Sequence, residues 1–409
     1  MSAPRGPQHL PIAAAAASGT SGAGHLVGSD DDQLMIETEI FRGPSGLARV
    51  ADDWDRILAE TPHRSLYHLR ELWESAAGTI VPDPESLVVL QMRRGGAPAA
   101  IALLQRSIRS RFGVKLRQWH VPKHVEVPPR GFLAAPGVSG AEIVAAIKRT
   151  LRGKVAGGWD VLSLSGVLDA APVSDVIASP PGLSIVGLRK TCDAIVCGAT
   201  YEDMLAGFSR NFRSNLSKAR NKLAKEAEVE FRSTTDPARV RAGFDEFVEI
   251  EASGWKGAKG SGTAMKLHPE VLAYYRRLLD RLAGRGVVVS NCLRVGGRPI
   301  ASQMCLKVDG TLHLYKLAYD EAWARVAPGN MLLEWVVKKG IAEGDVKEVD
   351  ILGNPRWFRD WRPVSRNVHD VHLFNTTPVG LAVHAAMRAK PRIAALRARL
   401  ARGPVPGEA

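Results

Sequence analysis

The chain of 409 residues is long enough for two or three domains of ordinary size. Its 45% apolar and 24% charged residues are typical of a globular protein, and its uncharged apolar runs are too short to span a bilayer. A net charge of +13 favours an anionic partner, which nucleic acid, an anionic membrane surface and a polyphosphate cofactor would all satisfy. The four cysteines show no paired CxxC spacing, which argues against a disulfide framework or a zinc site.

The N-terminal segment, residues 1–35, is rich in Ala, Gly and Ser. Its apolar run follows two prolines and a single arginine, so we interpret it as a disordered tail rather than a signal peptide. We therefore expect a cytoplasmic protein, with structure beginning at an apolar-periodic segment around Leu47, Trp54 and Ile57.

Two distant segments of the chain resemble each other at an offset of 201 residues. Residues 87–104 and 288–305 both consist of a strand, a Gly-Gly turn and a second strand, which is the pattern of a β-hairpin. An Ala-Pro-Gly turn then precedes a helix at 135–137 and again at 327–329, and each helix is followed by a strand containing aspartate. The repeat predicts two copies of one α/β domain, over residues 36–195 and 196–385, followed by a basic Pro/Arg-rich tail over 386–409.

A strongly basic helix is predicted at the start of the second copy, over residues 204–226. Its apolar positions recur at spacings of three and four, and they are Phe208, Phe212, Leu216, Ala219 and Leu223. The remaining circumference carries Arg210, Arg213, Lys218, Arg220, Lys222 and Lys225. This face is either solvated or a docking surface for an anionic donor, RNA or polymer.

The rest of the second copy predicts a mixed sheet. Strands over 286–295, 300–308 and 311–320 are joined by short turns and must be antiparallel, whereas the helix that begins at Pro328 leads to a parallel strand near 348–352. Proline suits the first helical position, and Gly329 permits a close approach to the backbone. The N–H groups of Gly329, Asn330 and Met331 would then form an anion site at the helix start. An ordinary strand-to-helix turn is the alternative.

This order of elements resembles the GNAT acyltransferase fold, in tandem copies similar to the CelD-like (BioF2-like) acetyltransferases and the related Fem aminoacyltransferases. The likeness covers roughly residues 40–375 and rests on these segments: FSRNFRSNLSKARNKL, SGWKG, GGRPIAS, KLAYDEAWARVAPGNMLLEW, VDILG and RWFRDWR. The GNAT motif RxxGxG would place Arg or Gln at Ala324 and Gly at Ala327, so this chain keeps only part of it.

The resemblance implies a set of site residues. The donor, acetyl-CoA or another acyl-CoA, would bind at Arg325, Pro328, Gly329, Asn330 and Met331. The catalytic candidates are Asp350, His313 and Tyr319, and the acceptor-side candidates are Trp255, Lys256, Lys316, Asp320 and Trp357. By strand alternation, His313 and Tyr315 should share one face and Lys316 the other. His369 and His372 have metal-ligand spacing but lack a third ligand, so we predict no metal.

We therefore expect an acyltransferase in which an acceptor amine or hydroxyl, on a small molecule or a saccharide, attacks the donor thioester directly. The first copy, whose helix should start late after Val138-Ser139-Gly140, is expected to be the structural or acceptor-side half. The resemblance suggests envelope or exopolysaccharide metabolism as the setting. Three alternatives remain: a nucleic-acid-binding protein using helix 204–226, an aminoacyl-tRNA-dependent transferase of the Fem type, and a catalytically silent scaffold.

Overall fold

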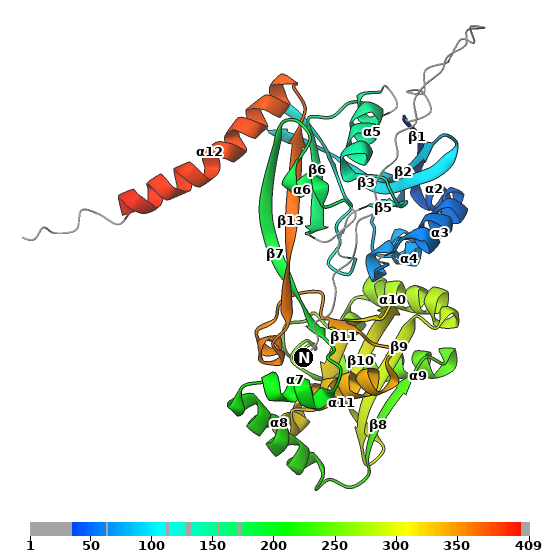
Figure 1. The fold of residues 1–409 in the computed structure, drawn as a ribbon, viewed down its shortest axis with the longest axis vertical. Coiled ribbons are helices and arrows are strands. Elements are labelled where there is room, and N and C mark those ends of the chain that lie inside the picture. The colour runs from blue at the N-terminus through cyan, green and yellow to red at the C-terminus, as the bar shows by residue number, and fades with distance from the viewer. Residues whose placement is uncertain are drawn as a thin grey trace, which may run out of the picture. The chain divides into compact units, whose positions relative to one another are not determined.

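The computed structural model describes residues 35–62, 64–111, 114–127, 132–153, 156–169 and 173–401, of which residues 111 and 391–401 are described by their backbone alone. The predicted N-terminal tail lies outside these residues, apart from Met35. From Ile36 onward the described strands form one mixed sheet in the order β1-β2-β3-β4-β6-β13-β7-β12-β11-β10-β9-β8, with β5 paired to β3 (Figure 1).

The predicted duplication is confirmed by the order of elements in the two halves. In the first half, β1 (Ile36–Arg42), β2 (Leu87–Arg94), β3 (Ala97–Arg111) and β4 (Val114–His120) are antiparallel, and helix α5 (Gly140–Arg152) leads to β6 (Val161–Leu168), which is parallel to β4. In the second half, β8 (Val229–Thr234), β9 (Val288–Val295), β10 (Arg298–Val308) and β11 (Thr311–Tyr319) are antiparallel. Helix α11 (Pro328–Glu343) then leads to β12 (Glu348–Asp350), which is parallel to β11.

The matching turns explain why the repeat is visible in the sequence. Gly95-Gly96 and Gly296-Gly297 adopt φ angles of +55° and +79°, and of +55° and +73°. A two-residue hairpin loop of this kind needs positive φ at both positions, which glycine adopts without steric cost. The first-half helix α5 begins late, as expected, because Ser139 caps it by accepting a hydrogen bond from the Glu142 N–H.

Two long strands join the halves. Strand β7 (Ser184–Val196) follows the first-half strands in the chain, yet it pairs with β12 of the second half. Strand β13 (Val364–Phe374) comes after the second half and lies between β6 and β7. Strand β6 of the first half therefore pairs with β13, which follows the second half in the chain, and β12 of the second half pairs with β7, which precedes that half. The boundary between 195 and 196 falls at the end of β7 and stays a prediction.

The remaining helices cover the sheet. The first half carries α2 (Gly43–Arg49), α3 (Ala51–Glu60), α4 (Arg70–Ala77) and α6 (Asp175–Ala178), with 3-10 turns η1 (Leu66–His68) and η2 (Pro84–Ser86). The second half carries α7 (Tyr201–Gly207), α8 (Arg210–Leu223), α9 (Pro237–Ser253) and α10 (Pro269–Leu282). It also has the 3-10 turns η3 (Met265–Leu267), η4 (Ala283–Arg285), η5 (Glu321–Val326) and η6 (Arg356–Trp361). Helix α12 (Pro378–Ala401) follows β13.

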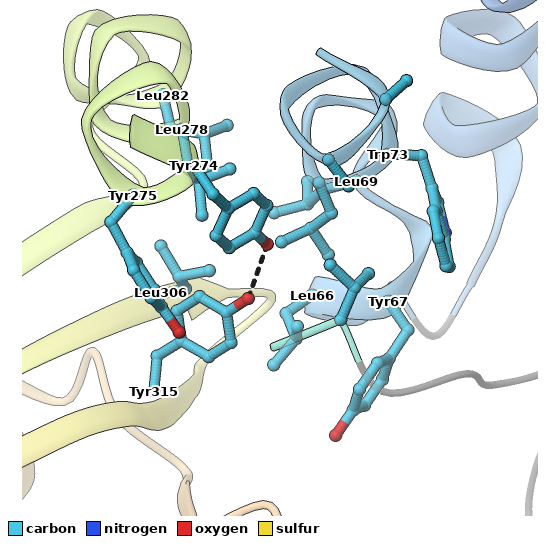
Figure 2. Packing of buried hydrophobic residues seen from close by; sticks show 14 of the residues in the cluster. Leu66, Tyr67, Leu69, Trp73, Tyr274, Tyr275, Leu278, Leu282, Leu306 and Tyr315 are labelled. Carbon is cyan, nitrogen blue, oxygen red and sulfur yellow. Dashed lines mark hydrogen bonds between the residues drawn. The ribbon is translucent and has the colours of Figure 1, made fainter. Parts of the chain in front are cut away.

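One apolar cluster is shared by both halves. Helix α10 packs against α4, and Figure 2 shows Tyr274, Leu278 and Leu282 facing η1 and α4. The Tyr274 and Tyr315 hydroxyls are 2.7 Å apart and hydrogen-bonded within this apolar contact. Because buried hydroxyls need a partner, this pair lets two tyrosines pack at the seam without an unsatisfied polar group.

Candidate functional site

A cavity of about 320 Å³ lies where β10 and β11 meet the start of α11. The chain enters it through Ala327, which has the left-handed φ of +47°, and Pro328 then opens the helix. Left-handed backbone favours glycine, which is the residue that the GNAT motif has at this position. Ala327 therefore adopts the backbone conformation expected of that glycine, although it is an alanine. The cavity is lined by Ala301, Ser302, Gln303, Leu317, Ala318, Tyr319, Ala324, Ala327, Pro328, Gly329, Asn330, Leu332 and Trp357.

The first turn of α11 offers fewer backbone donors than the sequence suggested. Pro328 has no N–H, and the Met331 N–H donates to the Ala327 carbonyl at 3.0 Å. Met331 is also buried, so its backbone belongs to the helix rather than to the cavity. The N–H groups of Gly329 and Asn330 precede this first helical bond and are the two that an anion in the cavity could accept from.

Side chains around this turn hold it in place. The Asn330 Oδ1 accepts a hydrogen bond from the Trp361 indole N–H at 3.3 Å. A Cβ built on Gly329 would meet only the Tyr319 ring, at 3.8 Å, so a larger side chain there would extend into the cavity. Tyr319 and Trp357, two of the predicted site residues, both line the cavity and are partly exposed. Arg325 does not line it: its guanidinium pairs with Glu226 at 2.7 Å and lies over Trp323.

His313 and Asp350 form a buried pair on β11 and β12. They occupy the last paired position of these parallel strands, and the His313 Nδ1 is 3.1 Å from the Asp350 Oδ2. The other carboxylate oxygen accepts the Leu352 N–H at 2.7 Å. The His313 Nε2 is buried and has no hydrogen-bond partner among the described residues, while the Tyr67 ring of the first half contacts the imidazole edge-on. The predicted catalytic pair is thus brought together, but outside the lining of the cavity.

Lys316 is on the opposite side from the one that strand alternation predicts. The β10–β11 register shifts between Met304 and Cys305, which leaves Tyr315 as an extra residue in a β-bulge. As a result the Tyr315 hydroxyl and the Lys316 ammonium both reach Glu126, the latter at 2.7 Å. The expectation that the two side chains face opposite ways is therefore wrong, and the bulge is the reason.

Glu126 reaches the second half from the loop that follows β4. Its carboxylate accepts a hydrogen bond from the Tyr275 hydroxyl and pairs with Lys316. Burial acts to raise the pKa of Glu126, but the charge and hydrogen bond of Lys316, with that of Tyr275, outweigh it and lower the pKa. Sequence reasoning missed Glu126, because nothing in its local sequence indicates a partner 190 residues away.

Three of the predicted acceptor-side residues make structural contacts instead. Asp320 caps η5 by accepting the Ala322 N–H at 3.0 Å, and it also pairs with Arg298. The Lys256 ammonium is 2.9 Å from the buried Glu251 carboxylate. The Trp255 backbone N–H donates to Glu321, and its indole is exposed. These contacts account for Trp255, Lys256 and Asp320 without a ligand, and their substrate roles remain predictions.

The basic segment 204–226 is two helices rather than one. Ser209 breaks it by capping α8, and the predicted apolar stripe is buried throughout. Arg220, expected on the free polar face, instead pairs with the buried Glu334, which also accepts from Tyr201 at 2.6 Å and lies 3.2 Å from Lys338. Lys222 donates to the Arg325 carbonyl at 3.3 Å, which places α8 against η5. Arg210, Lys218 and Lys225 remain exposed.

The two histidines of β13 that have metal-ligand spacing contact other side chains of the protein. His369 lies 2.7 Å from Asp169, and His372 is hydrogen-bonded to Ser163 at 2.9 Å. Within the described residues, no three His, Cys, Asp or Glu side chains gather as metal ligands would. Nor does that part of the chain contain a helix with the length and apolar character needed to cross a membrane.

Comparison with known proteins gives one family match. Residues 210–359 match the acetyltransferase (GNAT) domain family, a span that includes β9 to β12, α11 and the cavity. A search of curated protein sequences gives no match.

Several solved structures are similar over most of the chain at low identity. L-PGS from Bacillus licheniformis is 13% identical, with 85% of this chain and 98% of that one covered and a TM-score of 0.49. FemX is 11% identical, covering 81% and 98%, with a TM-score of 0.46. A tandem GNAT protein from the clavulanic acid biosynthesis pathway is 12% identical, covering 82% and 98%, with a TM-score of 0.43.

The family match falls on the half whose element order the sequence analysis assigned to a GNAT-type donor site. Its strands, its helix after the Ala-Pro-Gly turn and the cavity at that turn are all within the matched residues. Residues 210–359 are therefore assigned to the acetyltransferase (GNAT) domain family.

Proposed function

We propose that the protein transfers an acyl group from acyl-CoA, with acetyl-CoA the first donor to test, to an amine or hydroxyl of a small-molecule or saccharide acceptor. The observation that carries this proposal is the opening of the α11 first turn into the cavity beside β10 and β11. Two backbone N–H groups at a helix N-terminus suit a diphosphate, and the largely apolar strand walls suit an acyl-pantetheine arm.

The residues present fit such a donor with a reduced cradle. Pro328 removes one donor and Met331 uses another, so Gly329 and Asn330 must supply the backbone contacts. The absence of a side chain at Gly329 leaves that approach open. Asn330, held by Trp361, fixes the turn in place before the donor arrives, which lowers the cost of ordering it.

Direct transfer asks little covalent chemistry of the protein. The acceptor nitrogen or oxygen bonds to the acyl carbon, the carbon–sulfur bond breaks to release CoA as a thiolate that takes up a proton, and the acceptor's own proton must be removed. An alkylamine with a pKa of about 10 is mostly protonated at neutral pH, so a base is needed. In this proposal His313, oriented through Nδ1 by Asp350, takes the proton at its unpartnered Nε2. Tyr319, which lines the cavity, would position the acyl group. Positioning of the two reactants supplies most of the rate, up to about 7–11 kcal/mol.

The test is calorimetric titration of acetyl-CoA into the wild type and Gly329→Val. The valine side chain should occupy the donor cradle, and we expect at least a hundredfold loss of affinity with native unfolding behaviour. Gly187→Val is the matched control, because Gly187 lies in strand β7 with nothing within 4 Å of a built Cβ. Unchanged acetyl-CoA affinity in Gly329→Val would mean that this turn connects to α11 without binding the donor.

The exposed cations of α8 favour one second candidate, an aminoacyl-tRNA donor. Arg210 and Lys218 on α8 and Lys225 just after it are exposed, and α8 packs against η5 next to the cavity. A tRNA would release counterions from these residues, so its binding should weaken steeply with salt. If the protein binds aminoacyl-tRNA with this salt dependence and does not bind acetyl-CoA, its donor is aminoacyl-tRNA, as in the Fem-type alternative, and not acyl-CoA.

A further inference from the structure

A second cavity, of about 490 Å³, is lined in part by η6, the 3-10 turn that also contributes Trp357 to the donor cavity. Its lining is polar and includes Thr191 and Asp193 of β7, Ser365 of β13, and Asn354, Arg359 and Arg362 from the segment around η6. The 3-10 turn η6 contributes to both cavities, since Trp357 lines the first and Arg359 the second. A ligand that passes over this short turn could occupy both.

The charge of the second cavity favours an anion. The Arg359 side chain forms no hydrogen bond or ion pair with any residue that the structure describes. Arg362 donates to the Gly207 carbonyl but pairs with no carboxylate within the described chain. Other arginines of the second half do have an acidic partner, as Arg220, Arg298 and Arg366 do. Two guanidinium groups left without one in the same cavity suit a phosphate, which arginine can bind through two parallel hydrogen bonds.

The floor of this cavity offers contacts for hydroxyl groups. Asp193 is only 4% exposed, and its Oδ1 accepts a hydrogen bond from the Ser365 hydroxyl at 2.7 Å. Thr191 accepts a hydrogen bond from the Asn354 amide at 2.9 Å. A carboxylate would repel a bare phosphate but accepts well from a sugar hydroxyl. The combination of two arginines with Asp193 therefore matches a phosphate and a hydroxyl carried on one ligand.

The backbone of the same segment is held in an unusual conformation. Leu352 and Arg362 have left-handed φ angles of +61° and +51°, and they flank the stretch that carries Asn354 and Arg359. Such a conformation is strained for a residue other than glycine and persists where surrounding contacts enforce it. The Arg362 guanidinium also donates a hydrogen bond to the Gly207 carbonyl at the end of α7.

Size gives the reason to connect the two cavities. A cavity of about 320 Å³ is at the lower end of the roughly 300–1,000 Å³ that pockets for drug-sized ligands occupy. Coenzyme A is larger than a drug-sized ligand, so the first cavity cannot enclose it all. We propose that the second cavity binds the phosphorylated ribose of the acyl-CoA donor, with Arg359 and Arg362 on the 3′-phosphate and Asp193 on the adjacent ribose hydroxyl. This inference rests on the proposed function.

The experiment compares coenzyme A with 3′-dephospho-coenzyme A by calorimetric titration into the full chain. The wild type should bind coenzyme A about tenfold or more tightly, because charge-assisted bonds to the 3′-phosphate are absent from the dephosphorylated ligand. Arg359→Ala should remove most of that difference while its affinity for 3′-dephospho-coenzyme A stays at the wild-type value. Arg362→Lys, which keeps the charge and loses the two-pronged geometry, should remove part of it.

Arg356→Ala is the matched control, since Arg356 lies on the same 3-10 turn, is exposed and lines neither cavity. Equal affinity of the wild type for the two ligands overturns the inference, as does an undiminished difference in Arg359→Ala. If neither ligand binds the wild type at all, the proposed donor is wrong, and this subsite falls with it. Binding of both without discrimination leaves the donor proposal standing and removes only the subsite.

Discussion

His313 and Asp350 face each other at the point where strands β11 and β12 stop pairing. Their Nδ1 and Oδ2 atoms are 3.1 Å apart, and both side chains are almost fully buried. A carboxylate against Nδ1 holds the proton of a neutral imidazole on that nitrogen, which leaves Nε2 as an acceptor. Strand β11 continues to Tyr319 without β12 beside it, so the pair lies where the sheet opens.

If His313 is the base, replacing either member of the pair should lower turnover and spare the donor. We expect His313→Gln to reduce kcat by about 10²–10⁴-fold, and Asp350→Asn by less, with acetyl-CoA affinity unchanged. Steady-state kinetics with calorimetry on each variant measures both quantities. His372→Gln, a histidine on β13 bonded to Ser163, is the control and should keep full turnover. Wild-type kcat in His313→Gln would assign proton removal to another group or to water.

Ala327 lies in left-handed backbone immediately before α11, with φ at +47°. Glycine avoids about 1–2 kcal/mol of strain there but loses about 0.5–1 kcal/mol of chain entropy on folding. We therefore expect Ala327→Gly to raise the free energy of unfolding by about 0.5–1 kcal/mol in denaturant titrations. Ala324→Gly, in the preceding 3-10 turn, lacks positive φ and should be destabilising. Equal losses in both variants would show that the left-handed residue is not strained.

Glu126 should make stability depend on acid pH. Its pKa in the folded protein lies below the ordinary value of 4.5, so the carboxylate stabilises the fold above that pH. This contribution is lost as the pH falls through the lowered folded-state pKa. We expect Glu126→Gln to cost about 1–3 kcal/mol near pH 7, since Lys316 loses its buried partner. The difference from wild type should shrink between about pH 5 and pH 3.

Denaturant titrations at a series of pH values measure this difference. Glu343→Gln removes an exposed partner of Lys339 on α11 and serves as the control, with little expected effect at any pH. A wild-type minus Glu126→Gln difference that stays constant down to pH 3 would contradict the role of the carboxylate.

The second half should fold poorly without the first. Residues 196–385 lack nearly all of β7, which lies between β12 and β13, and they expose the α10 face that packs on α4. Expressed alone, this fragment should aggregate or unfold without cooperativity. Residues 36–385 are the control and should unfold cooperatively in a thermal melt. A well-behaved fragment would show that β7 and the seam contribute little.

Much of the fold could be predicted from the sequence because its signals are short-range. The Gly-Gly hairpins, the capped start of α5, the buried stripe of α8 and the Pro328 start of α11 each depend on residues a few positions apart. Turn chemistry and apolar periodicity act over that distance. The repeat of the same signals at an offset of 201 residues therefore indicated two copies, and the family match places a GNAT domain over most of the second.

Only the tertiary structure decided which distant groups meet. Strands β7 and β13 fill positions beside strands that are remote in the chain, and no local pattern selects those neighbours. Because of the bulge at Tyr315, Lys316 pairs with Glu126. Arg220, which was expected on an unpaired cationic face, pairs with Glu334. Asp320 became a helix cap, while Arg359 and Arg362 came to share a cavity with Asp193. Ion pairs form between charged side chains that packing brings close together in the folded protein. The pairing of charges at the site therefore depends on the tertiary structure and cannot be derived from sequence spacing.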